Sequence, residues 1–104
     1  MPLTHEFRET VMEDMRKNPG FRDAMLREAI DALLAGELNV GRSILRGYVN
    51  ATIGFETLAK EVKIPVKSLM RMLGPSGNPQ MSNLFAVIGA LQAHAGIELH
   101  VAAE

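Results

Sequence analysis

Hydrophobic residues recur at helical spacing along most of the chain, and turn-forming residues separate the stretches that show this pattern. The spacing predicts helices over residues 4–17, 19–35, 40–52 and 80–94. Asn18 and Pro19 are expected to begin the second helix as its N-cap and first-turn residue, and Gly36 to end it. The pattern therefore predicts an all-α, five-to-six-helix bundle.

The third and last of these helices have one apolar face each. We expect Tyr48 to point inward on the third helix, Arg42 and Arg46 to point outward, and Asn39 to cap its start. On the last helix, Met81 is expected on the inner face.

Residues 55–73 contain two short apolar stripes separated by Lys63-Ile64-Pro65. The stripes are too short and too close for either helix to be stable alone, which is typical of a helix-turn-helix unit. Ala59 provides the small residue needed where the two helices cross, with Leu58 and Leu69 facing the interior. The second helix is then expected to carry an outward, mixed, basic surface suited to a DNA major groove, formed by Val66, Lys67, Ser68, Met70 and Arg71.

Each of these residues has an expected role on DNA. Arg71 has the reach and the planar fork to bond one guanine, whereas Lys60 and Lys63 lie beside the groove wall and are expected to hold phosphates. Ser76 and Asn78, in the turn after the second helix, are also expected at phosphates because their side chains are short. We expect Met70 to touch a thymine methyl group.

The segment after the last helix alternates apolar and polar residues, as a strand does. Ile97, Leu99 and Val101 would lie on one face of that strand. Since the chain offers no second convincing strand, we expect antiparallel pairing with the same segment of a second copy, giving a homodimer.

Composition places the chain in a broad class. Its 104 residues, 47% of them hydrophobic, are enough for one domain with a modest core. It contains no cysteine, no apolar run of membrane-spanning length, and no basic-then-apolar amino terminus. We therefore expect a cytoplasmic protein.

Charge is unevenly distributed although the net charge is only −1. Residues 1–39 carry five basic and eight acidic residues, residues 40–80 carry six basic and two acidic, and the remainder carries two acidic residues. A basic middle segment between acidic ends is expected when one face of a protein meets phosphate. A solvated charged face is the alternative interpretation.

The sequence supplies little chemistry for catalysis or metal binding. His5, His94 and His100 lack partners at ligand spacing, and the serines lack a neighbouring His/Asp pattern. The run Gly74 to Pro79 lacks the lysine and spacing of a phosphate loop and follows a helix. We predict no enzyme activity, no cofactor and no metal.

Four segments resemble one family. They are A-L-L-A-G-E (32–37), L-A-K-E (58–61), S-L-M-R-M-L-G-P-S-G-N-P (68–79) and G-I-E-L-H-V (96–101). In these segments the chain is similar to antidote (antitoxin) proteins of bacterial addiction modules and related prophage-type regulators with a lambda-repressor-like helix-turn-helix. The resemblance covers residues 32–101.

The resemblance implies sequence-specific binding to double-stranded DNA, usually as a dimer on a palindromic operator, with repression of the protein's own operon. It also implies a cognate toxin as a partner, and the acidic N-terminal helices are the natural surface for it. The chain would divide into an N-terminal extension (1–36), a DNA-binding core (37–96) and a dimerisation strand (97–104). An all-α protein-interaction module without DNA binding remains the alternative.

Three positions depart from the usual pattern of such units. Phe55 lies where glutamine, which would reach a phosphate, is common. Lys63 lies where glycine is common, so the turn must either hold a non-glycine residue in the left-handed conformation or take another geometry. Pro65 lies where serine or threonine usually caps the second helix.

Overall fold

The protein is all-helical in the part that the computed structural model describes, residues 5–103, with side chains described from residue 9. The six helices are α1 (His5–Lys17), α2 (Pro19–Leu34), α3 (Leu38–Ala51), α4 (Gly54–Val62), α5 (Val66–Met72) and α6 (Met81–Ala95). The predicted all-α class is confirmed, and the predicted helix bounds agree to within a few residues.

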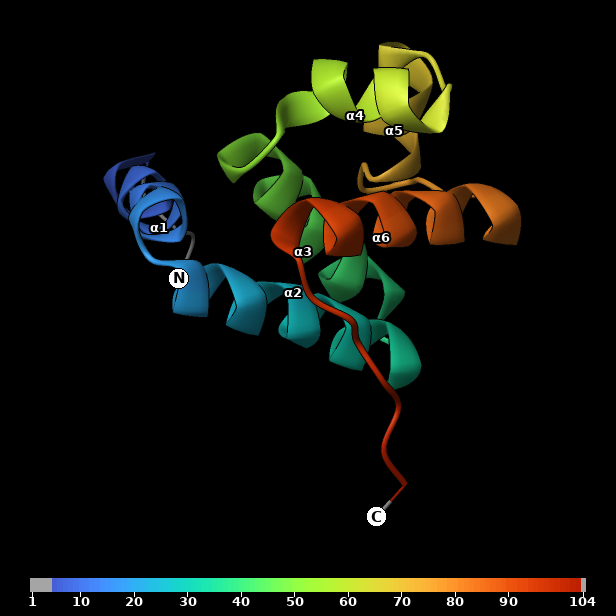
Figure 1. Ribbon diagram of the computed structural model, residues 1–104. Coiled ribbons are helices and arrows are strands. Elements are labelled where there is room, and N and C mark those ends of the chain that lie inside the picture. Colours follow the sequence, from blue (N-terminus) through green and yellow to red (C-terminus); the bar gives the residue numbers. More distant parts are fainter. Residues whose placement is uncertain (1–4, 104) are drawn as a thin grey trace.

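The helices enclose one hydrophobic core (Figure 1). The long pair α2 and α3 forms its base, α1 packs against both of these helices, and α6 packs against α4. The largest fully buried side chains come from α2 to α6 and from the residue after α5: Leu26, Leu45, Val49, Leu58, Leu69, Leu73, Val87 and Leu91. Because α4 and α5 share this core, their orientation is fixed by the rest of the domain.

Local signals set the ends of α2 as predicted. The Asn18 side chain accepts a hydrogen bond from the Phe21 N–H (3.2 Å), and Pro19 occupies the first helical position. At the other end, Gly36 has φ of 82°, its N–H donates to Leu33 O, and the Glu37 N–H donates to Ala32 O. These two bonds form a Schellman motif, which requires a left-handed residue at the position of Gly36.

The predictions for Arg42 and Asn39 on α3 were wrong. Arg42 is 9% exposed and points inward, and Asn39 lies inside the helix, where its side chain accepts a hydrogen bond from Arg42. Arg46 is half-buried and lines a surface hollow. A sequence pattern predicts an exposed position for arginine, but here the backbone carbonyls of residues that lie 32 and 33 positions further along the chain accept its hydrogen bonds and compensate its burial. Tyr48 is buried, as predicted.

The predicted C-terminal strand is not seen in the part of the chain that the structure describes. Residues 97–103 have no regular secondary structure. Ile97 and Leu99 are half-buried against the core of their own chain, the Leu99 N–H donates to Gln92 Oε1 (2.7 Å), and Val101 remains 75% exposed. The apolar alternation is therefore used for packing within the chain. The end of the tail projects from the body (Figure 1).

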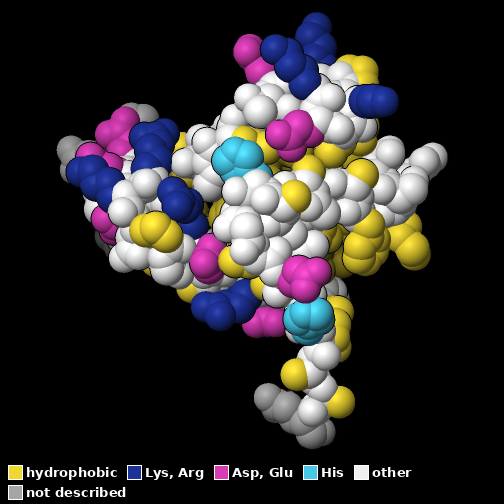
Figure 2. Space-filling view, in the orientation of Figure 1, with side chains coloured by type: hydrophobic (Ala, Val, Ile, Leu, Met, Phe, Trp, Pro, Cys, Tyr) yellow, Lys and Arg dark blue, Asp and Glu magenta, His cyan; other side chains and the backbone are white. Residues whose placement is uncertain are grey.

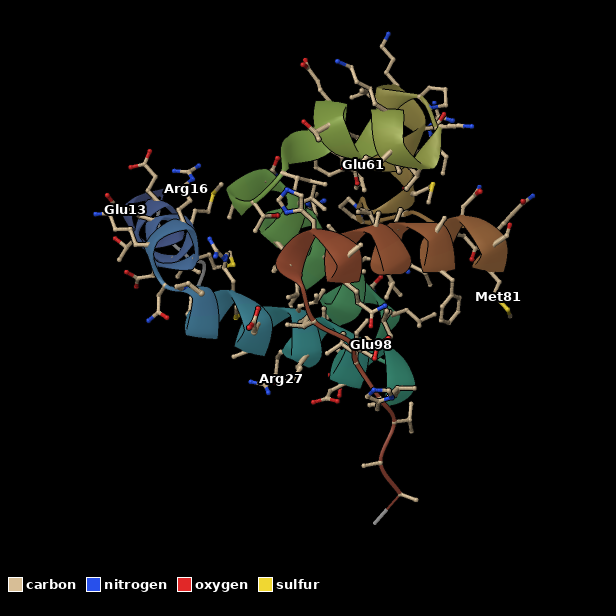
Figure 3. The ribbon with its side chains drawn as sticks, in the orientation of Figure 1. Glu13, Arg16, Arg27, Glu61, Met81 and Glu98 are labelled. Carbon is tan, nitrogen blue, oxygen red and sulfur yellow. The ribbon has the colours of Figure 1, made fainter. Side chains whose placement is uncertain are left out.

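A second surface is more apolar than the sequence indicated. Met81 was expected to point inward, but it is 75% exposed at the free end of α6 (Figure 3). Phe85 and Leu34 are each 62% exposed. They border an apolar groove of about 420 Å³ between α2, α6 and the tail, lined by Ile30, Leu33, Leu34, Leu38, Leu84, Phe85, Ile88, Gln92, Leu99 and Val101.

Candidate nucleic-acid interface

Helices α4 and α5 are joined by a three-residue turn, Lys63 to Pro65. Ala59 is buried where the turn begins, and its carbonyl accepts hydrogen bonds from the N–H groups of Lys63 and Ile64. Two bonds to one carbonyl close the end of α4, and they require Lys63 to be left-handed, at φ 59° and ψ 42°. Lys63 is the only non-glycine residue with positive φ among residues 5–103.

Pro65 begins α5 in an extended conformation without a side-chain cap. Its fixed φ of −57° suits the entry into the helix, and its carbonyl accepts the first helical hydrogen bond from the Leu69 N–H (3.0 Å). Leu69 is fully buried, so it anchors α5 to the core. The opposite face of this short helix therefore points outward.

The outward face of α5 agrees only partly with the predicted DNA-contact residues. Lys67, Met70 and Arg71 are exposed, and Ser68 is half-buried. Val66 is half-buried and packs against the core, so less of its side chain can reach a ligand. Figure 2 shows Lys and Arg side chains gathered at the end of the molecule formed by α4 and α5. Exposed Glu56 on α4 and Glu61, labelled on α4 in Figure 3, reduce the positive charge there.

The turn after α5 folds back onto the end of that helix. Gly77 lies so close that an added Cβ would be 2.1 Å from Met72 O and 2.5 Å from Arg71 O. Its N–H donates to Gly74 O (3.0 Å), and the Gly74 N–H donates to Arg71 O (3.1 Å). Only glycine fits at residue 77 in this arrangement, which explains why the G-P-S-G-N-P run follows the helix.

Arg42 holds the same turn from inside. Its Nε donates to Gly74 O (3.3 Å), and its Nη2 donates to Pro75 O (3.4 Å) and to Asn39 Oδ1. Among residues 9–103 the structure gives Arg42 no carboxylate partner. Its positive charge lies beneath the turn, where three oxygen atoms accept its hydrogen bonds, and adds to the potential at that surface.

A groove of about 460 Å³, lined by both polar and apolar residues, lies where the two turns and α5 meet, and we call it the turn groove. It is lined by Lys63, Ile64, Pro65, Ser68, Arg71, Met72, Ser76, Gly77, Asn78 and Asn83. Five of the predicted DNA-contact residues meet here, Lys63, Ser68, Arg71, Ser76 and Asn78, whereas Lys60, Val66, Lys67 and Met70 do not line it. None of the described residues lining the groove carries a carboxylate.

Asn83 is a groove residue that the sequence analysis missed. It lies in the first turn of α6, twelve residues after Arg71, and enters the groove because the intervening turn folds back. Its signal in the sequence was indirect: two turn-forming prolines and two glycines between α5 and α6 imply that the start of α6 lies close to the end of α5.

Other parts of the described structure offer weaker chemistry. Residues 5–103 contain no group of three His, Asp or Glu side chains that could hold a metal ion. A second hollow contains Arg16, Arg22, Asp23, Tyr48 and His94, where burial and the nearby Asp23 charge raise the pKa of the Tyr48 hydroxyl. The Tyr48 hydroxyl thus stays protonated at neutral pH and is a poor nucleophile. No helix among these residues is both long and apolar enough to span a bilayer.

Comparisons of the chain with protein-family models, with curated proteins and with solved structures found no match. The function therefore has to be argued from the chemistry of the surface formed by α4, α5 and the two turns.

Proposed function

We propose that the protein is a sequence-specific DNA-binding transcriptional regulator in which α4 and α5 act as a helix-turn-helix and α5 enters the major groove. The observation that carries this proposal is the turn groove. Its lining combines the cationic side chains of Lys63 and Arg71 with hydroxyl and amide donors and contains no carboxylate. Phosphate oxygens accept hydrogen bonds and carry negative charge, so this donor set complements a DNA backbone. The exposed Lys67 and Met70 beside it are free to meet base edges.

The antitoxin-like part of the proposal rests on the resemblance of the segment 68–79 and its neighbours. Under this part of the proposal, the protein is an autoregulatory repressor that binds a palindromic operator as a homodimer. Its protein partner is a toxin, which binds the acidic N-terminal helices. The exposed acidic residues Glu13 and Asp14 on α1 suit a basic partner. The gene neighbourhood tests this part, because a small basic toxin-like reading frame beside this gene is expected.

A protein-interaction module is the second candidate, favoured by the apolar groove between α2, α6 and the tail. Exposed apolar patches commonly mark protein contacts. The two candidates differ in what the basic end does, because only a DNA-binding protein needs Lys63, Lys67 and Arg71 for its function.

A gel-shift titration on the DNA upstream of the protein's own gene tests DNA binding. We expect affinity for this DNA to exceed that for scrambled DNA by about a thousandfold or more, and to fall steeply with salt. Lys67→Glu should abolish the shift, whereas Arg27→Ala, which removes an exposed charge on α2, should leave it unchanged. Equal, weak binding to both DNAs by the unaltered chain would favour the interaction module.

A further inference from the structure

The position of Arg71 changes its expected role. It was expected to reach a guanine, but it lines the turn groove together with Ser76 and Asn78, the residues expected at phosphates. Lys67 and Met70, also on α5, are exposed outside this groove. We propose that the turn groove binds a phosphodiester of the DNA backbone and that Arg71 holds this phosphate, which leaves base reading to Lys67 and Met70. This inference rests on the proposed DNA binding.

The groove supplies donors of the kinds that a phosphodiester requires. Arg71 offers two parallel N–H groups and Lys63 a compact ammonium, and both form charge-assisted hydrogen bonds. Ser68 and Ser76 contribute hydroxyls, and Asn78 and Asn83 contribute amide N–H groups. A phosphate held among them would meet no competing carboxylate from the groove lining.

The walls of the groove are held in place before any ligand arrives. Gly77 packs on the backbone of Met72, and the buried Arg42 bonds two carbonyls of the turn, so Ser76 and Asn78 are carried on a fixed loop. Donors that need little ordering lose less entropy on binding. The fixed loop therefore favours a repeated, sequence-independent ligand such as the backbone.

The conformation of Lys63 is a second, independent observation. A lysine in the left-handed conformation is strained relative to glycine, and strained backbone of this kind clusters at functional sites. Glycine would fold more easily at this position but would bring no charge. Placement of the Lys63 ammonium at the groove accounts for the retained strain.

The test combines two pairs of variants. Asn83→Asp puts a carboxylate into the groove, and Ser82→Asp puts the same charge on the neighbouring residue of α6, outside the groove. Both stand in the first turn of α6, where an acidic residue suits the helix dipole, so folding is preserved. Arg71→Ala is compared with Lys67→Ala. Each variant is titrated with operator and with scrambled DNA at several salt concentrations.

The phosphate role predicts a specific pattern. Asn83→Asp should weaken binding to both DNAs by about tenfold or more, and Ser82→Asp by much less. Arg71→Ala should weaken both DNAs by the same factor and reduce the salt slope by about one unit, whereas Lys67→Ala should reduce the preference for operator. If Arg71→Ala affects only the operator, or Asn83→Asp equals Ser82→Asp, the groove does not hold a phosphate. If the unaltered chain shifts neither DNA, the proposed function itself fails.

Discussion

At the scale of single residues, Lys63 links backbone strain to the proposed function. Its left-handed conformation closes α4 through two hydrogen bonds to Ala59 O, and its side chain lines the turn groove. Stability and ligand binding therefore make opposite demands on this residue: the backbone favours glycine, and the groove favours a cation.

We predict that Lys63→Gly raises the free energy of unfolding by about 0.5–1 kcal/mol. Glycine relieves the left-handed strain of the folded state, and the greater conformational entropy of the unfolded chain cancels only part of this gain. The same variant should bind DNA several-fold more weakly, because a phosphate contact is lost. Urea denaturation and a binding titration measure the two effects. Lys63→Ala is the control: it removes the charge but keeps the strain, so only binding should fall.

At the scale of elements, the ends of α2 could be predicted because capping depends on adjacent residues. Asn18, Pro19 and Gly36 act within a few residues of their partners. Arg42 could not be predicted, since its partners in the turn are 32 and 33 residues away and only the folded chain brings them together. The same reason hides Asn83, which reaches the turn groove only because the turn folds back on α5.

The turn between α5 and α6 gives a prediction at this scale. Gly77→Ala places a Cβ 2.1 Å from Met72 O, a backbone atom that cannot move away cheaply. We expect a loss of about 2–3 kcal/mol in stability, measured by urea denaturation, together with weaker DNA binding as the groove opens.

The matched control for Gly77→Ala is Gly89→Ala on α6, an exposed glycine with nothing within 4 Å of an added Cβ. Alanine is the better helix former, so Gly89→Ala should stabilise the protein by up to about 1 kcal/mol. If the two variants have equal effects, the turn is not packed against α5 as described.

At the scale of the whole molecule, periodicity alone predicted the all-α class and the inward positions of Leu58 and Leu69, since each helix must bury one face. It failed at the tail, because an alternating segment does not reveal which surface its apolar side chains meet. Ile97 and Leu99 pack on their own chain, whereas Val101, Phe85 and Leu34 are exposed at the apolar groove. A homodimer, as part of the proposed function, would have to use that surface rather than a strand formed by residues 97–101 alone.

This gives the prediction for assembly. Phe85→Glu combined with Val101→Glu should convert the proposed dimer to monomers, because each copy would bring two charges into an apolar contact. Both residues are exposed in the single chain, so the fold should survive, whereas removal of the whole tail from Ile97 would also strip Leu99 from the core. Sedimentation equilibrium at micromolar concentration measures the mass, and circular dichroism verifies folding.

Operator binding by the double variant shows whether the dimer contact serves DNA binding. In a dimer, two copies of α5 about 34 Å apart would contact the two halves of a palindrome. The double variant should therefore bind the full operator at least about a hundredfold more weakly than the unaltered chain. On a single half-site, the two proteins should bind with equal affinity. Val40→Glu is the control, because Val40 is exposed on α3 but does not line the apolar groove. If the double variant remains dimeric, or if the unaltered chain sediments as a monomer, dimerisation through the apolar groove is contradicted. Each protein molecule would then bind DNA alone or dimerise through another surface.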